Sequence, residues 1–98
     1  MRILAIGDVC GPCGVSCIER HLPQVRRELE ADAVVVNAEN ASVFGVKPED
    51  ARRLLSAGAD VLPLGNHSFH QRAVADFLAD SEAIVRPANS APSLPGSG

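Results

Sequence analysis

Five polar residues follow short apolar segments of this sequence, where their side chains could bind a metal ion or transfer a proton. Asp8 follows the first segment, Glu39 and Asn40 follow the second, and Asn66 and His67 follow the third. Carboxylate and amide oxygens suit hard divalent cations, whereas imidazole suits iron or zinc. Glu39 has two oxygens that can bridge a metal pair, and His67 can bind metal or move a proton near neutral pH. These residue types point to metal binding combined with acid–base chemistry.

A pair of metal ions held about 3.5–4 Å apart can activate a water molecule and bind a phosphoryl oxygen. A histidine beside the pair can protonate the alkoxide that leaves. Each polar cluster alone could instead be an ordinary turn, because Asp, Asn and Gly are common turn residues. Three such clusters after three successive apolar segments favour one shared functional site over three unrelated turns.

The elements that would position these residues follow from the apolar pattern. We expect strands at 3–6, 33–36, 61–64 and 84–85, and helices at 15–30, 48–57 and 71–79. Strands that alternate with helices form a parallel sheet, and the absence of polar alternation predicts strands buried on both faces. Ligands of such sheets bind beyond the carboxyl ends of the strands, where the polar clusters lie.

Four details of these elements depend on Pro and Gly. Residues 10–14 contain two Gly and one Pro and predict a loop. Pro23 predicts a kink in the first helix, or a later start for it. Pro63 weakens the prediction of a third strand. Pro48 and Gly58 suit the start and the end of the second helix.

Composition excludes several classes of function. The chain has 98 residues, enough for one domain at most, and its net charge of −3 argues against an extended nucleic-acid or anionic-membrane surface. With no Trp or Tyr and three Phe, a stacking platform for single strands is not expected. No apolar run reaches membrane-spanning length, and the first residues predict a strand rather than a signal peptide. We therefore expect a cytoplasmic protein.

The chain divides into two parts by composition. Residues 1–86 are expected to form an α/β half-domain that carries the metal site, and residues 87–98 are expected to form a tail. This tail contains three Pro, two Gly and three Ser. Three or four parallel strands alone would leave open sheet edges, which favour association with another chain.

Three motifs resemble those of calcineurin-like metallophosphoesterases: Leu4–Val9, Asn37–Ala41 and Gly65–His67. No His follows Asp8 at the second position, and a Glu-Asn pair replaces the usual second Gly-Asp block. With Arg86–Asn89 downstream, this variant is similar to the YmdB-type subfamily, whose members are phosphodiesterases of cyclic nucleotides, including 2′,3′-cyclic ones. The resemblance spans nearly all of the chain. It implies a parallel βαβαβαβ unit that forms the N-terminal half of an αββα sandwich.

The resemblance also implies roles for the five residues. Asp8 would bind the first metal ion, and Asn40 would bind or steady the same ion. Glu39 would bridge the two ions, and Asn66 would bind the second. His67 would be the general acid. The implied cofactors are two divalent metal ions, iron or manganese, and the implied substrate is a cyclic nucleotide or another small phosphodiester.

The family also differs from this chain in length. Family members continue beyond a segment like Pro95-Gly96, and their later half supplies further His ligands. We therefore expect a fragment, a truncated product or one part of a split protein. The partner is expected to be a second copy of the chain or a missing C-terminal half. The alternative is a catalytically inactive α/β module that acts by assembly with another chain.

Two further groups of residues remain open in function. Cys10, Cys13 and Cys17, with His21 nearby, have a spacing that could bind zinc or an iron–sulfur cluster. Alternatively, Cys13 and Cys17 are small apolar fillers near a helix start, and His21 is an ordinary helix residue. His70 stands where the family usually has an acid, so it either replaces a lost ligand or is a surface histidine.

Overall fold

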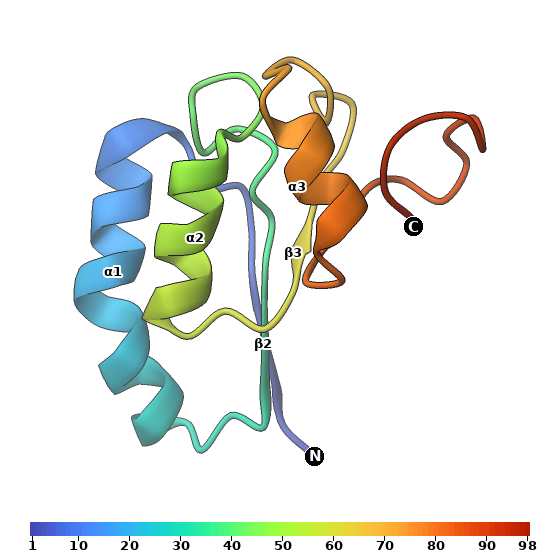
Figure 1. Ribbon diagram of the computed structural model, residues 1–98. Helices are drawn as coiled ribbons and strands as arrows, with labels where there is room; N and C mark the ends of the chain where they lie inside the picture. The colour runs from blue at the N-terminus through green and yellow to red at the C-terminus, as the bar shows by residue number, and fades with distance from the viewer.

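The computed structural model describes residues 1–98 as helices packed against short parallel strands (Figure 1). In chain order the elements are β1 (Ile3–Ile6), α1 (Gly11–Glu28), β2 (Ala33–Val36), α2 (Pro48–Ala57), β3 (Leu62–Pro63), α3 (Val74–Asp80) and β4 (Ile84–Val85). The predicted α/β class is confirmed. No helix has the length and apolarity needed to cross a membrane.

The strands form two parallel pairs, β1 with β2 and β3 with β4. One parallel bridge, between Val35 and Val61, connects the pairs. Along β3, the N–H groups of Leu62 and Leu64 donate to the carbonyls of Ala83 and Val85 beside β4, at 2.7 and 2.9 Å. The N–H groups of successive residues point to opposite sides of a strand. The N–H group that Pro63 lacks would therefore have pointed toward β2.

The predicted single βαβαβαβ sheet is therefore confirmed only as an α/β arrangement with parallel strand pairs. Hydrogen bonds between β2 and the segment of β3 come from both sides, and Val61 donates to the carbonyl of Val34 at 3.3 Å. Val36 donates to Val61 at 3.0 Å, and Ala38 donates to Pro63 at 3.1 Å. These two bonds keep the carboxyl ends of β2 and β3 together, which is what the candidate site requires.

Helix boundaries depart from the predictions mainly in α1. This helix begins at Gly11, so residues 11–14 are helical rather than a loop, because Pro12 occupies the first turn, where its missing N–H is not needed. Pro23 lies inside the helix without ending it. α2 has the predicted bounds and ends at Gly58, whose φ of 125° suits glycine. α3 begins only at Val74, after a run of turns.

The core lies between the strands and the three helices, of which α1 and α2 run side by side (Figure 1). Val34 and Val36 of β2 are buried there, together with Leu22 of α1 and Leu54 of α2. The opposite face of β1 is open, and Ile3 is 61% exposed. The prediction of strands buried on both faces is therefore wrong for β1.

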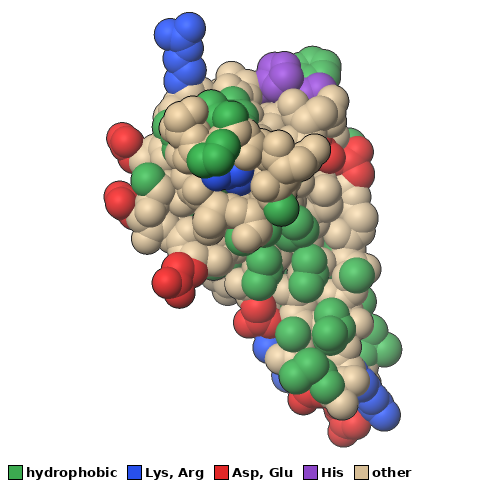
Figure 2. Space-filling view, turned by 90° about the vertical axis from the view of Figure 1, so that its right-hand side faces the viewer, with side chains coloured by type: hydrophobic (Ala, Val, Ile, Leu, Met, Phe, Trp, Pro, Cys, Tyr) green, Lys and Arg blue, Asp and Glu red, His purple; other side chains and the backbone are tan.

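The open face has a simple cause, because no element of this chain packs over it. Residues of β1 and β2 alternate between a more and a less exposed position along each strand. Figure 2 shows hydrophobic side chains gathered over the lower half of this side of the molecule. Although the sequences of β1 and β2 are apolar throughout, the two faces of these strands differ in their exposure to solvent.

An ion pair joins α1 to α2 on the outer side of the helices. Arg53 donates two hydrogen bonds to the Glu19 carboxylate, one of them from Nε at 3.0 Å. The bond from Arg53 lowers the pKa of Glu19, and partial burial opposes this only in part. A carboxyl group whose pKa is lower in the folded state stabilises the fold above its unfolded pKa, and this contribution disappears as the pH falls through the folded pKa.

We expect Glu19→Gln to remove this pH dependence. The stability difference between wild type and Glu19→Gln should be present at pH 7 and should be smaller at pH 3. Urea unfolding midpoints at both pH values measure it, with Glu82→Gln as a control, because Glu82 is exposed and makes no ion pair. An equal difference at the two pH values would contradict the assignment.

The segment 87–98 has no helix or strand, and it folds back onto Arg86. The buried guanidinium of Arg86 donates to the carbonyl oxygens of Pro87, Ser90 and Gly96 at 3.3–3.4 Å. Its backbone N–H donates to Ser97 at 3.0 Å. The composition predicted a tail, and Arg86 closes that tail into a loop.

Arg86→Ala is expected to lower the free energy of unfolding by about 1–3 kcal/mol, because three carbonyl oxygens lose a charged donor. Amide hydrogen exchange in residues 87–98 should become faster. Arg86→Lys should recover only part of the loss, because an ammonium group lacks the planar fork of guanidinium. An unchanged unfolding midpoint together with unchanged exchange in Arg86→Ala would contradict this role.

Candidate functional site

The three predicted polar clusters lie at one rim, beyond the carboxyl ends of β1, β2 and β3. The amide nitrogen of Asn40 donates to Oδ1 of Asp8 at 2.8 Å. The backbone N–H of His67 donates to Oε2 of Glu39 at 3.2 Å. The structure thus links the β1 cluster to the β2 cluster and the β2 cluster to the β3 cluster. Asn66 is exposed at the same turn as His67.

Backbone hydrogen bonds hold the loops after β1 and β2 together. Gly11 donates to the carbonyl of Asn40 at 3.0 Å, and Val9 donates to the carbonyl of Asn37 at 3.2 Å. These bonds continue the parallel pairing of β1 and β2 into the loops. The Asp8–Asn40 contact therefore rests on a fixed backbone.

Asp8 has a second partner in Cys10. The Cys10 thiol donates to Oδ2 of Asp8, with sulfur and oxygen 3.3 Å apart. This hydrogen bond raises the pKa of Cys10, and desolvation and the negative charge of Asp8 act in the same direction. Cys10 therefore contacts a rim carboxylate as a thiol, rather than completing a cysteine cluster.

Gly65 makes room for the carboxylate of Glu39. A Cβ atom added at Gly65 would overlap both oxygens of that carboxylate. Sequence reasoning did not assign a role to Gly65, although its place directly before Asn66 and His67 was a usable signal. Only hydrogen fits at this position while Glu39 keeps its place.

His67 belongs to a cluster of three rings with Phe44 and His70. Its ring centroid lies 5.3 Å from that of Phe44 and 4.7 Å from that of His70. The Nδ1 atoms of the two histidines are 3.3 Å apart. His70, predicted as a replacement ligand or a surface histidine, is exposed and contacts the proposed acid. Phe44, which is 56% exposed, was missed because nothing in the sequence near it indicates a site.

The donor set at the rim fits an oxygen-ligated divalent cation. Asp8 and Glu39 offer carboxylates, and Asn40 and Asn66 offer amide oxygens. The hydrogen bond from the amide nitrogen of Asn40 to Asp8 leaves the Asn40 oxygen available. No three carboxylate, imidazole or thiol groups come together closely enough to hold an ion, so the two carboxylates need amides and further ligands to complete a shell.

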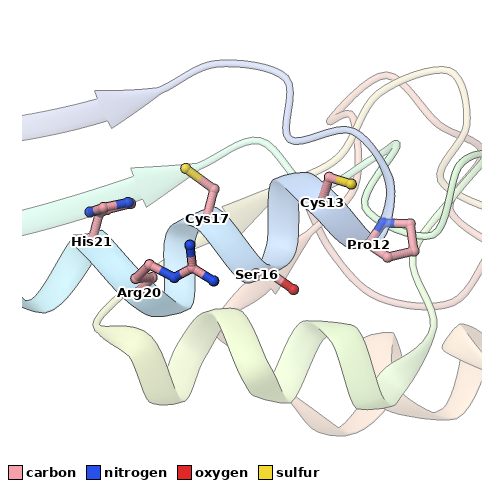
Figure 3. Close-up of a pocket in the computed structure, with 6 residues that line it drawn as sticks. All are labelled: Pro12, Cys13, Ser16, Cys17, Arg20 and His21. Atoms are coloured by element: carbon pink, nitrogen blue, oxygen red, sulfur yellow. The ribbon is translucent and has the colours of Figure 1, made fainter.

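The remaining cysteines lie on an exposed face of α1. Cys13 and Cys17 line a shallow groove of about 380 Å³ together with Pro12, Ser16, Arg20 and His21 (Figure 3). All three cysteines are exposed and free, so the prediction that Cys13 and Cys17 are apolar fillers is wrong. Both side chains lie on the side of α1 opposite its buried residues Val15 and Leu22. The groove does not contain a ligand set for zinc or an iron–sulfur cluster.

Comparison with known proteins agrees with this arrangement. The chain is 34% identical over its whole length to the 2′,3′-cyclic-nucleotide 2′-phosphodiesterase of Bacillus subtilis, and it covers 38% of that protein. It is 29% identical to a putative phosphatase/phosphodiesterase of Mycoplasma genitalium, over 91% of the chain and 32% of the relative. The chain therefore spans only about a third of the length of these relatives.

Two solved structures share the fold. One is a hypothetical protein from Thermus thermophilus, with a TM-score of 0.90 and 40% identity, of which the chain covers 38%. The other is a phosphatase from Mycoplasma pneumoniae, with a TM-score of 0.88 and 30% identity. The match covers 98% of this chain and 36% of that protein. The profile of the YmdB-like protein family matches residues 4–98. The chain therefore belongs to the YmdB-like protein family.

Proposed function

We propose that this protein is a metal-dependent phosphodiesterase that hydrolyses cyclic nucleotides or related small phosphodiesters. The observation that carries the proposal is the meeting of three polar clusters at one rim, through the contacts of Asn40 with Asp8 and of His67 with Glu39. Relatives named as phosphodiesterases or phosphatases support the same class of reaction.

Four residues of this chain would hold two divalent cations, with iron or manganese as the expected metals. When bound, such a pair supplies a water-derived nucleophile and positive charge for the phosphoryl oxygens. Asp8 and Asn40 would hold one ion, and Glu39 would contribute to both through its two oxygens. Asn66 would contribute its free amide oxygen to the second ion.

His67 would donate a proton to the oxygen of the leaving group. A histidine suits this task because its reference pKa is about 6.5. The backbone N–H of His67 donates to Glu39, so one turn of chain positions both the acid and a metal ligand. A small shift of this turn would therefore disturb both functions.

The open face of β1 and β2 supports a further part of the proposal. Both strands present apolar side chains there without a covering layer. We propose that this face packs against a second sheet in an αββα sandwich, as the greater length of the relatives allows.

Hydrolysis of bis(p-nitrophenyl) phosphate and 2′,3′-cyclic AMP by the purified protein with Mn²⁺ tests the proposal. His67→Ala should lower kcat by about 10²- to 10⁴-fold, because the leaving group loses its proton donor. His21→Ala is the matched control, since His21 lies on α1 away from the rim. No metal-dependent hydrolysis by the wild type, or equal rates in wild type and His67→Ala, would contradict the proposal.

A further inference from the structure

The side chains of His70 and His67 contact each other through a ring nitrogen of each residue. The two Nδ1 atoms lie 3.3 Å apart, within hydrogen-bond distance. Two neutral imidazoles can form this bond only if one ring carries its proton on Nδ1 and the other carries its proton on Nε2. The contact therefore ties the tautomer of each ring to that of the other.

The pair is held in place by Phe44, whose ring lies 5.3 Å from that of His67 and 5.9 Å from that of His70. The side chain of Gln71 donates to the carbonyl oxygen of Phe44 at 3.0 Å. A Cβ at Gly45 would lie 3.1 Å from His67 O and from His70 Cβ, so this loop packs tightly on the turn that carries both histidines.

The loop before Phe44 is itself fixed. Ser42 donates to Asp50 through its hydroxyl group, and the same hydroxyl accepts the backbone N–H of Lys47 at 2.9 Å. Val43 has a φ of 77°, a conformation that a β-branched residue adopts only when its surroundings impose it. The Phe44 ring is thus presented to the two histidines by a constrained backbone.

We propose that His70 is a positioning residue that accepts the Nδ1 proton of His67 and thereby reserves Nε2 of His67 for proton transfer to the leaving group. This inference rests on the proposed role of His67 as the general acid. The protonated His67 carries a proton on each nitrogen, and it gives the Nε2 proton to the leaving oxygen. It then remains neutral with its proton on Nδ1, still donated to His70, whose own proton stays on Nε2.

The bond thus has the same direction before and after proton transfer. An acceptor at Nδ1 orients the ring, as the third member does in a catalytic triad. The acceptor here is neutral and exposed, so its effect is modest. We expect His70→Ala to lower kcat by about threefold to tenfold, with KM unchanged.

The test is the tautomer of His67, measured from ring ¹⁵N chemical shifts of the purified protein without metal or substrate. The spectra are recorded at about pH 8.5, where free histidine is neutral. Wild-type His67 should carry its proton on Nδ1, and His70 should carry its proton on Nε2. In His70→Ala, the His67 signals should move toward a mixture of tautomers, and His70→Asp should restore the Nδ1 proton.

His21→Ala serves as the control, and it should leave the His67 signals unchanged. Wild-type His67 with its proton on Nε2, or an unchanged His67 tautomer in His70→Ala, would overturn the inference. This readout requires no hydrolysis, so it separates the inference from the proposed function. If the protein shows the predicted tautomer but no phosphodiesterase activity, the proposed function is contradicted and the inference about the His67–His70 pair stands. In a protein that hydrolyses the substrate, the rate of His70→Ala measures what the pair contributes to catalysis.

Discussion

Gly65→Ala is expected to abolish metal-dependent hydrolysis while leaving the fold intact. A Cβ at Gly65 would overlap the Glu39 carboxylate, which lies at the end of a flexible side chain and can swing away. The backbone needs no change, because Gly65 does not have a positive φ. The displaced carboxylate would lose its hydrogen bond from the His67 N–H. It would also no longer be placed to bind the proposed metal pair.

Gly7→Ala is the matched control for this prediction. Gly7 also lies at the rim, directly before Asp8, and a Cβ there would meet no atom within 4 Å. Both variants should unfold within about 1 kcal/mol of wild type, because the change from Gly to Ala mainly affects the unfolded chain. Phosphodiesterase rates and Mn²⁺ binding should fall in Gly65→Ala alone. Equal rates in the two variants would show that the Glu39 position is not needed.

Glu39→Gln is expected to lower the hydrolysis rate by about 10³-fold or more, because the proposed bridge between the metal ions loses its negative charge. Stability should change little. The hydrogen bond that Glu39 accepts from the His67 N–H can be accepted equally by an amide oxygen. Loss of activity with a retained fold would therefore assign Glu39 to chemistry rather than to packing.

Glu82→Gln provides the comparison, because it removes the same charge from an exposed residue away from the rim. Hydrolysis of bis(p-nitrophenyl) phosphate over a range of Mn²⁺ concentrations measures both variants. Added metal should recover part of the rate of Glu39→Gln if weakened binding is the main defect. A rate close to wild type at every metal concentration would contradict the bridging role.

The shared rim was predictable because its cause is local. Each polar cluster directly follows an apolar segment, and parallel strands place their carboxyl ends together. The bounds of α2 were also predictable, since Pro48 and Gly58 mark its ends through their own backbone preferences. For these elements the relevant physics lies within a few residues of sequence.

Other features depend on contacts between distant segments. Gly65 matters because Glu39, which lies in a different loop, occupies the space beside it. Phe44 matters because its loop folds onto the turn of His67 and His70. One face of β1 is open because no other layer of secondary structure packs on it. The apolar sequence of a strand does not predict whether such a layer is present. Such contacts have no signature in the spacing of a single sequence.

Binding of Mn²⁺ to the purified protein tests the central claim most directly, because the rim is proposed as an oxygen-ligated metal site. Titration followed by electron paramagnetic resonance should show binding to the wild type and to Cys13→Ser. Binding should be strongly weakened in Asp8→Asn and in Glu39→Gln. Binding that survives both rim substitutions, or that is lost in Cys13→Ser, would contradict the assignment and place the metal elsewhere in the molecule.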